Sequence, residues 1–356
     1  MTAALASTDS PNTSAKKSLF EGSTQYTNWR YSPEDLRATR TSMNQAAVAA
    51  IRSTFETDSV HLSVILQPPG SSSDVQFLDA TEEQLLVKLY TTKIAQLCAH
   101  FRFPEEVEAT AVSYLKRFYL KNTVMDWHPK NVMLTALFLA TKTTNHPISL
   151  DAFTSNIPRT SPSDVLDLEF LVAQSLAFEF AIWHTHRALW GLWLDVQDLP
   201  DAPSRESLQQ YYDTALQHVR TSRITDVELI YAPSQIALAC LSLAQPDLAT
   251  SWARSKGVES SLPIIETIKD VILQNGDVPS VEVVREIDRR LKLCKNPEKI
   301  VGSKAYIAKR QREDREAEEK RMKKADIVRQ AIADGDPFGE ELDGKAGAVE
   351  ALDDDD

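Results

Sequence analysis

Residues 114–143 read YLKRFYLKNTVMDWHPKNVMLTALFLATKT, and the second half of this stretch decides the fold. Its core, residues 131–140, holds only two polar side chains, Asn131 and Thr135. A helix that is apolar on every side belongs either inside a packed domain or in a membrane. The run is far shorter than the roughly 18 apolar residues that a bilayer span requires. Because Pro129 also suits the first turn of a helix, the stretch predicts a buried central helix.

The central pattern occurs a second time further along the chain. Aligning Pro129 with Pro233 pairs PKNVMLTALFLA with PSQIALACLSLA, and Leu137 then matches Leu241 in an unbroken register. Two repeats of about a hundred residues match the usual size of a domain. The sequence therefore predicts an all-α protein of two tandem repeats, each built around its own buried helix.

The composition is that of a soluble globular chain, with 42% hydrophobic and 25% charged residues among 356. A formal net charge of −12 argues against a general nucleic-acid or anionic-membrane surface, since phosphate binding depends on Lys and Arg. The three cysteines, Cys98, Cys240 and Cys294, lack CxxC or CxxH spacing, which argues against a zinc site or a disulfide framework. With no signal peptide or membrane span visible in the sequence, we expect a soluble intracellular protein without a cofactor or metal.

Motifs of catalytic chemistry are not found in the sequence. It contains no glycine-rich phosphate loop, nucleophile elbow or HExxH helix. His184 and His186 form a pair, but residues two apart do not share a helix face. We therefore expect His184 to lie in the link between the repeats, and we favour a binding module over an enzyme.

The repeats are flanked by further segments. Residues 19–31 carry Tyr26, Trp29 and Tyr31, and this density of aromatic side chains predicts that the segment lies against a domain or a partner. The organisation we expect is a disordered tail (1–18), the aromatic segment with an N-terminal helix and loop (19–77), the first repeat (78–182), the second repeat (183–278), a C-terminal helix (279–303), and a charged helix with an acidic disordered tail (304–356).

Helix signals add detail to this organisation. The N-terminal helix is predicted over residues 33–55, and the fifth helix of the first repeat over residues 161–178, with its core face formed by Leu166, Phe170, Ala173 and Leu176. An amphipathic helix follows Pro279, with an apolar stripe of Val281, Val284, Ile287, Leu291 and Leu293. Opposite charges three or four residues apart predict a solvent-exposed helix from Lys304 to about Ala333; the alternative is a basic contact face at 309–312 and 320–324.

Several separated motifs resemble those of the cyclin family. The tandem five-helix repeat contains KRFYLKNTVMDWHPKNVMLTALFLATKT (116–143) followed by LEFLVAQSLAFEF (168–180), which is similar to a cyclin box. Together with YAPSQIAL (231–238) and YTNWRY (26–31), the pattern resembles more closely the cyclin that partners the CDK-activating kinase. The resemblance covers roughly residues 20 to 295, and it implies two cyclin boxes with extra N- and C-terminal helices.

The resemblance also implies which residues bind a kinase. A cyclin grips the C-helix of its kinase and turns inward the catalytic glutamate, which pairs with the lysine that holds the ATP phosphates. The lysine that ends the central helix corresponds to Lys142, and the glutamate of the fifth helix to Glu169. Phe178 and Phe180 would supply the apolar side of the same surface. Taken without the family, these four residues would be a lysine at a helix C-terminus, a surface acid and two core side chains.

The family further implies partners and a location. The kinase would be a cyclin-dependent kinase of the CDK-activating type, acting on the activation loops of other kinases and on the C-terminal repeat of RNA polymerase II. A RING-finger assembly factor would be the third subunit, and the complex would join the general transcription factor TFIIH in the nucleus. The chain itself would be a non-catalytic regulatory subunit, without direct contact to nucleic acid or membrane.

Two alternatives stay open at this point. One is a transcription cyclin that serves an elongation kinase, and the other is a cyclin-fold general transcription factor that bridges DNA and polymerase. The latter would require a zinc ribbon and basic DNA-facing helices. The chain also departs from many cyclins, because Thr143, Thr144 and Asn145 follow Lys142 where acidic residues are common, and the first helix lacks an MRAIL-like docking motif.

Overall fold

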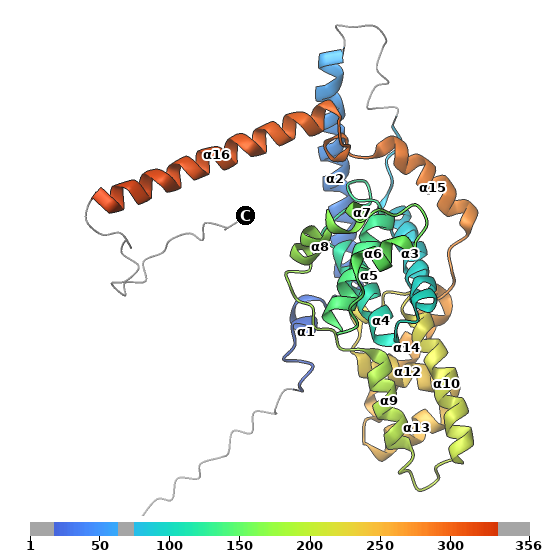
Figure 1. Cartoon of the computed structure of the whole chain (residues 1–356). Coiled ribbons are helices and arrows are strands. Elements are labelled where there is room, and N and C mark those ends of the chain that lie inside the picture. The colour runs from blue at the N-terminus through green and yellow to red at the C-terminus, as the bar shows by residue number, and fades with distance from the viewer. Residues whose placement is uncertain (1–17, 63–74, 334–356) are drawn as a thin grey trace, which may run out of the picture. The chain divides into compact units, whose positions relative to one another are not determined.

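The computed structural model describes residues 18–62 and 75–333, and every regular element in these ranges is helical (Figure 1). By internal contacts the chain divides into two units. The first comprises residues up to 53 and 70–295, and the second comprises 54–69 and 296 to the end. The predicted disordered tails, 1–18 and the acidic segment after the charged helix, lie outside the described residues except for Ser18.

The first repeat is built around α5 (Pro129–Thr143), the predicted central helix. It is buried on all sides from Val132 to Thr141, as expected for a helix without a polar face. Five further helices form the repeat: α3 (Ala80–Phe101), α4 (Glu105–Phe118), α6 (Leu150–Ser155), α7 (Ser163–Leu166) and α8 (Glu169–Ser175). Of these, α3, α4, α7 and α8 pack directly against α5.

Local sequence signals determine where these helices begin. The Asp79 side chain accepts hydrogen bonds from the N–H groups of Thr81 and Glu82 and caps α3. Pro129 occupies the first turn of α5, and the Ser149 side chain caps α6. The predicted start of the central helix at Pro129 is therefore confirmed.

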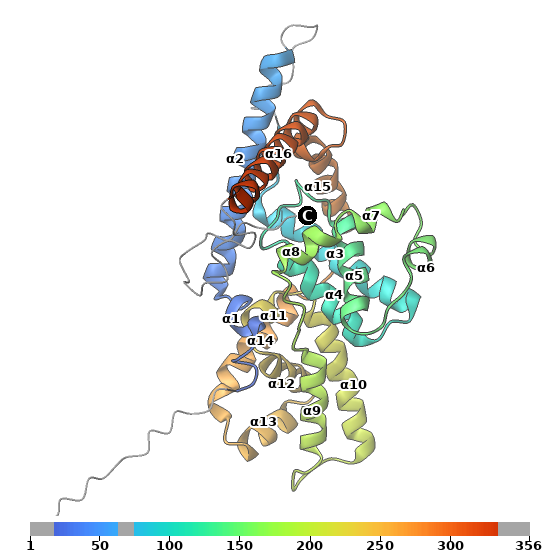
Figure 2. The ribbon, with the colours of Figure 1, turned by 60° about the vertical axis from the view of Figure 1, so that its left-hand side comes forward.

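The second repeat has the same plan around α12 (Pro233–Ala244). Four helices pack against α12: α9 (Thr185–Val196), α10 (Arg205–Ser222), α13 (Pro246–Ser255) and α14 (Leu262–Asn275). The short α11 (Val227–Ile230) and a 3-10 turn, η2 (Glu259–Ser261), complete it. α9 and α10 lie side by side in both views (Figures 1 and 2). Leu137 and Leu241, which the repeat alignment pairs, are both buried in the cores of their repeats.

The fifth helix of the first repeat differs from the prediction. Instead of one helix over 161–178, the structure has α7 and α8, separated at Asp167 and Leu168. The break changes which side chains face the core: Val165, Leu168 and Val172 are buried with the correctly predicted Ala173 and Leu176. Leu166 and Phe170 are exposed, so their assignment to the core face was wrong.

Further helices flank the repeats. The predicted N-terminal helix is longer than expected, α2 (Pro33–Leu62), and is preceded by α1 (Thr24–Asn28). α15 (Val281–Cys294) packs against α3, with Nε2 of His128 3.0 Å from Oδ1 of Asp288. Its buried side is formed by Val284, Ile287, Leu291 and Cys294, whereas the predicted stripe members Val281 and Leu293 are exposed.

The two repeats are joined through one face of α4. Arg223, which is buried, pairs with Glu105 at 2.7 Å and with Glu108 at 2.9 Å. Lys116, near the other end of α4, pairs with Glu228 at 2.9 Å and donates to the carbonyl of Thr225. Charges buried this deeply are tolerated because each is paired or hydrogen-bonded.

His184 lies in the link between the repeats, as predicted, and is buried. Its Nε2 is 3.2 Å from Oγ1 of Thr110, and its ring stacks on that of His186 at 5.0 Å. Burial, together with the neighbouring His186 and nearby arginines, lowers the pKa of His184 to about 3. Burial and Arg223 lower the pKa of His186 to about 4.

These shifts predict that the first unit loses stability in mild acid. The pKa of His184 in the folded chain lies below the ordinary histidine value of 6.5. Below pH 6.5 the unfolded chain therefore binds more protons than the folded chain, so the stability that is present above pH 6.5 falls as the pH decreases. We expect the free energy of unfolding to decline between pH 6.5 and 5, above the range in which ordinary carboxylates titrate. Denaturant unfolding across this range measures the slope. His184→Gln should reduce this slope, and the part that remains is due to His186. Equal slopes for wild type and His184→Gln would contradict the assignment.

The second unit contains a 3-10 turn, η3 (Pro297–Lys299), and α16 (Lys304–Ala333). The side chain of Ser303 accepts a hydrogen bond from the N–H of Tyr306, and Lys309 pairs with Glu298 at 3.0 Å. Beyond the first turns, from Arg310 to Gln330, every side chain of α16 is exposed. The predicted solvent-exposed charged helix is thus confirmed.

Candidate functional site

Lys142 and Glu169 form an ion pair at the surface of the first repeat. Lys142 lies in the last turn of α5, and Glu169 is the first residue of α8, which packs against α5. The distance from Nζ to Oε1 is 2.5 Å, and the side chains are 42% and 24% exposed. Nζ of Lys142 also lies 4.5 Å from the ring centroid of Phe138, a cation–π contact that fixes its direction. The pair leaves further donors on Lys142 and acceptors on Glu169 for a partner.

Two exposed phenylalanine rings lie beside this pair. Phe178 is 55% exposed and Phe170 is 61% exposed, with ring centroids 6.1 Å apart in an edge-on arrangement. Phe170 directly follows Glu169 on α8. Large apolar side chains that are grouped and exposed mark interaction sites more often than isolated ones do. We call Lys142, Glu169, Phe170 and Phe178 the α5–α8 surface.

Phe180, a predicted site residue, packs against the core, whereas Phe170, which was predicted to lie in the core, is exposed. Phe180 is half-buried, packs against the core of the first repeat, and lies 6.3 Å from Phe178. Sequence reasoning missed Phe170 because the continuous fifth helix placed it on the core face. Pro162 marks the start of α7, where the predicted helix also begins, so it does not signal the break at Asp167 and Leu168.

The three N-terminal aromatic residues lie against the chain itself. Trp29 is 2% exposed and packs with Leu36, Leu120 and Leu229, and Tyr31 packs on the same cluster. The N–H of Tyr31 donates to the carbonyl of Leu229 at 2.8 Å. The half-buried Tyr26 lies under the guanidinium of Arg30, 4.8 Å from the ring centroid. Of the two expectations for this segment, a domain or a partner, the structure places Trp29 and Tyr31 against the chain's own repeats.

Buried polar residues of α4 contact the N-terminal segment and the residues next to the α5–α8 surface. The hydroxyl of Tyr114 lies 3.0 Å from that of Thr143 and donates to the carbonyl of Phe180 at 2.8 Å. Burial raises the pKa of Tyr114 to about 12, so it remains a neutral donor. Arg117 lies over the ring of Trp29, and burial lowers its pKa to about 10, still charged at neutral pH.

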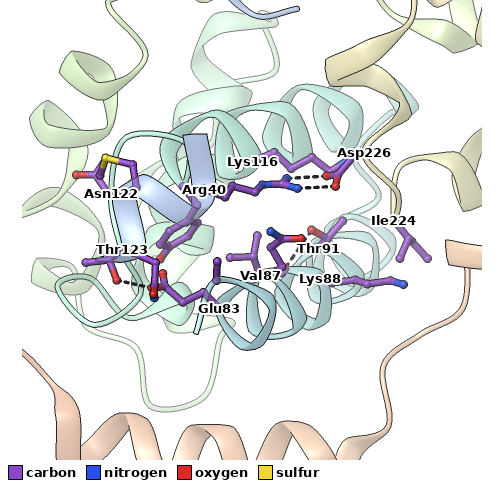
Figure 3. A pocket seen from close by; sticks show the side chains of 15 residues that line it. Arg40, Glu83, Val87, Lys88, Thr91, Lys116, Asn122, Thr123, Ile224 and Asp226 are labelled. Carbon is purple, nitrogen blue, oxygen red and sulfur yellow. Dashed lines mark hydrogen bonds and ion pairs between the residues drawn. The ribbon is translucent and has the colours of Figure 1, made fainter. Parts of the chain in front are cut away.

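A cavity of about 90 Å³, lined by both charged and apolar side chains, lies between α2, α3 and α4 (Figure 3). Arg40 forms two hydrogen bonds to Asp226, at 2.6 and 2.7 Å, and Lys116 is paired with Glu228. Glu83 accepts hydrogen bonds from three donors, Asn44 Nδ2, Thr123 Oγ1 and Val124 N–H, although burial raises its pKa. These charges already have partners. Through Arg40 with Asp226, and Asn44 with Glu83, the side chains around the cavity fix α2 to both repeats.

Within residues 18–62 and 75–333, no three His, Cys, Asp or Glu side chains are grouped to hold a metal ion. His184 and His186 are stacked on each other and enclosed, which does not suit chelation. Of the helices in the described ranges, none combines the length and apolar character that crossing a bilayer requires.

Family models match both repeats. The N-terminal cyclin domain matches residues 75–181, and the C-terminal cyclin domain matches residues 184–275. Together with the relatives described next, these matches show that the chain belongs to the cyclin family. The expected architecture of two cyclin boxes in an all-α fold is confirmed.

Within this family, the relatives include several named as cyclin-H. Cyclin-H of Xenopus laevis is 30% identical over 263 residues, which is 71% of this chain and 74% of the frog protein. Cyclin mcs2 of Schizosaccharomyces pombe is 29% identical over 322 residues, 90% of this chain and 98% of the relative. Cyclin CCL1 of Saccharomyces cerevisiae is 32% identical over 258 residues, 69% and 64% of the two chains. The resemblance drawn from the sequence motifs is thereby confirmed.

Solved structures give the same result. A chain of the CAK complex of Chaetomium thermophilum bound to ATP-γ-S has a TM-score of 0.71 and 29% identity, over 83% of this chain and 94% of that one. A chain of yeast TFIIK, the Kin28/Ccl1/Tfb3 complex, has a TM-score of 0.58 and 30% identity, over 71% and 99% of the two chains. Both similar chains belong to kinase complexes.

Proposed function

We propose that this chain is the regulatory cyclin of a CDK-activating kinase, which binds a cyclin-dependent kinase and switches it to its active form. The observation that carries the proposal is the α5–α8 surface, where an ion pair and two exposed rings lie together on a rigid cyclin box. Relatives of the H type and similar chains from the CAK and TFIIK complexes support the same assignment.

The α5–α8 surface suits a helix of the kinase. Phe170 and Phe178 provide an apolar contact, while Lys142 and Glu169 offer charged hydrogen bonds of both signs beside it. Such an interface holds the kinase C-helix in one position, so that its catalytic glutamate pairs with the lysine that binds the ATP phosphates. The four side chains stand on packed helices or on a hydrogen-bonded turn, which reduces the entropy lost on binding.

In this proposal the chain is a non-catalytic subunit. The kinase it activates phosphorylates activation loops of other kinases and the C-terminal repeat of RNA polymerase II, a RING-finger assembly factor is the third subunit, and the complex works in the nucleus as part of TFIIH. The yeast structure, which joins a cyclin to Kin28 and Tfb3, supports a three-subunit assembly. A cyclin for an elongation kinase is less well supported, since three relatives named as cyclin-H match over 75%, 88% and 74% of their own lengths.

Reconstitution tests the proposed function directly. The purified full chain is mixed with a CDK-activating-type kinase subunit, with and without the RING-finger subunit, and phosphorylation of an activation-loop protein and of a polymerase C-terminal repeat is measured. Stimulation of the kinase is the expected result. Stimulation of an elongation kinase alone would favour the alternative cyclin class, and failure to bind any cyclin-dependent kinase would overturn the proposal.

Truncating either member of the Lys142–Glu169 ion pair tests the α5–α8 surface. Lys142→Ala and Glu169→Ala should each weaken kinase binding by about 2–5 kcal/mol, because truncation leaves a charge of the partner without its hydrogen bond. The stability of the free chain should change by less than about 1 kcal/mol, since an ion pair this exposed contributes little to folding. Isothermal titration gives the affinity, and thermal melts give the stability.

A matched control uses an ion pair of similar chemistry elsewhere. Arg254 pairs with Glu259 at 3.1 Å on the second repeat, where both side chains are well exposed. Arg254→Ala should leave the affinity for the kinase unchanged. If the double variant lacking Lys142 and Glu169 binds as tightly as wild type, the α5–α8 surface is not the kinase contact.

A further inference from the structure

The turn that presents Phe178 has an unusual backbone. Ala177 and Phe178, which follow α8, have φ values of 53° and 57°, a left-handed conformation that non-glycine residues rarely adopt. The N–H of Ala177 donates to the carbonyl of Gln174, and the N–H of Phe178 to that of Ala173. This is the Schellman pattern that ends many helices, here with alanine at the position where glycine is usual. The direction of Phe178 therefore depends on a conformation that the local sequence does not favour.

The residue that follows the turn is held by the N-terminal segment. The carboxylate of Glu179 accepts hydrogen bonds from Nε1 of Trp29 at 2.5 Å and from Nδ2 of Asn28 at 2.6 Å. One residue further on, the carbonyl of Phe180 accepts from the hydroxyl of Tyr114. Hydrogen bonds from two other parts of the fold thus restrain the chain immediately after Phe178.

Trp29 is itself fixed. The guanidinium of Arg117 and the ammonium of Lys121 each lie 4.8 Å from its ring centroid. Its indole is almost fully buried and packs with Leu36, Leu120 and Leu229. An indole N–H held in this way is a rigid donor, so the position of Glu179 follows from the packing of a residue 150 positions away in the sequence.

We infer that Trp29 and Glu179 form a positioning pair that holds the Ala177–Phe178 turn, and with it the Phe178 ring, in the orientation that the α5–α8 surface presents to the kinase. The inference rests on the proposed function for the role of Phe178. In this arrangement the N-terminal aromatic segment promotes kinase binding without contacting the kinase. It does so by restraining a strained turn before the kinase arrives.

The first test needs no kinase. Trp29→Phe keeps an aromatic ring in the cluster but removes the N–H that bonds to Glu179. Hydrogen–deuterium exchange of the full chain should then rise several-fold at the amides of residues 177–180, because their restraint is lost, while the amides of α5 stay protected. Trp183→Phe, the same change at a partly exposed residue, is the control and should leave exchange unchanged. Unaltered exchange at 177–180 in Trp29→Phe would overturn the positioning role.

The second test couples the pair to kinase affinity by a double-mutant cycle. Trp29→Phe alone should weaken kinase binding roughly tenfold, but in a Phe178→Ala background it should have almost no further effect, since there is no ring left to position. Glu179→Gln, which retains a carbonyl acceptor for the indole, should bind better than Glu179→Ala. Additive losses from Trp29→Phe and Phe178→Ala would refute the inference. If Phe178→Ala alone leaves the affinity unchanged, the proposed kinase surface fails, and the exchange result still decides whether the pair holds the turn.

Discussion

Deleting residues 1–56 is expected to abolish activation of the partner kinase, whereas deleting residues 1–18 should leave it intact. The larger deletion removes Trp29 and Leu36 from their cluster with Leu120 and Leu229, and loss of a buried tryptophan alone costs about 3–5 kcal/mol. It also leaves the carboxylate of Glu179 without its two N-terminal donors. Both the stability of the fold beside the α5–α8 surface and the restraint on Phe178 should therefore be lost.

The same deletion opens the cavity shown in Figure 3. Asp226 loses Arg40, and Glu83 loses one of its three donors, Asn44. A carboxylate left buried without its partner is destabilising. Removal of the chain after Lys304 should be milder, because α16 presents an exposed charged surface over most of its length.

Kinase activity of the reconstituted complex, measured for each truncation, checks these expectations. Circular dichroism and thermal melts of the isolated chains show whether a loss of activity accompanies a loss of structure. Full activity without residues 1–56 would mean that the N-terminal segment is dispensable. In that case the positioning role of Trp29 would be excluded as well.

The second large effect is expected in the two cores. Leu137→Ala and Leu241→Ala should each lower the free energy of unfolding by about 2–5 kcal/mol, through lost burial and the cavity that remains. Leu137 is completely buried in α5, and Leu241 is 3% exposed in α12. The two effects should be similar because the residues hold equivalent positions in the two repeats. Denaturant unfolding of each variant gives the values.

Leu273→Ala is a matched control for these substitutions. Leu273 lies on α14 of the second repeat and is 60% exposed, so the same truncation there removes little buried surface. Its unfolding curve should nearly overlay that of wild type. If Leu137→Ala and Leu241→Ala also unfold like wild type, the alignment of the repeats does not identify their cores.

Much of the architecture was predictable from the sequence because its signals are local. A run without a polar face, led by proline, predicts α5 and α12 wherever the rest of the chain goes. Asp79 and Ser149 start helices by an equally local signal, because a cap bonds to backbone groups two or three residues away. The charges of Lys142 and Glu169 were visible, but their roles came from the resemblance to cyclins.

The details of the candidate site depended on tertiary contacts. Periodicity predicted one helix over 161–178. In the structure Val165, Leu168 and Val172 are buried instead, and the chain breaks between α7 and α8. That break exposed Phe170 beside Phe178. A pattern of apolar residues shows how many side chains a helix can bury, but the neighbouring helices decide which ones are buried.

Long-range polar pairs were outside the reach of the sequence. The bond from Trp29 to Glu179 spans 150 positions, the pairs of Arg223 with Glu105 and Glu108 join the two repeats, and nothing local to either partner indicates the other. The sequence by itself determined the all-α fold, its duplication and its central helices, because each of these depends on residues within a few turns of one another. Only the tertiary structure decided the break of the fifth helix, the ion pairs by which α4 joins the two repeats, and the direction of Phe178. These features depend on distant side chains that meet only when the core is packed.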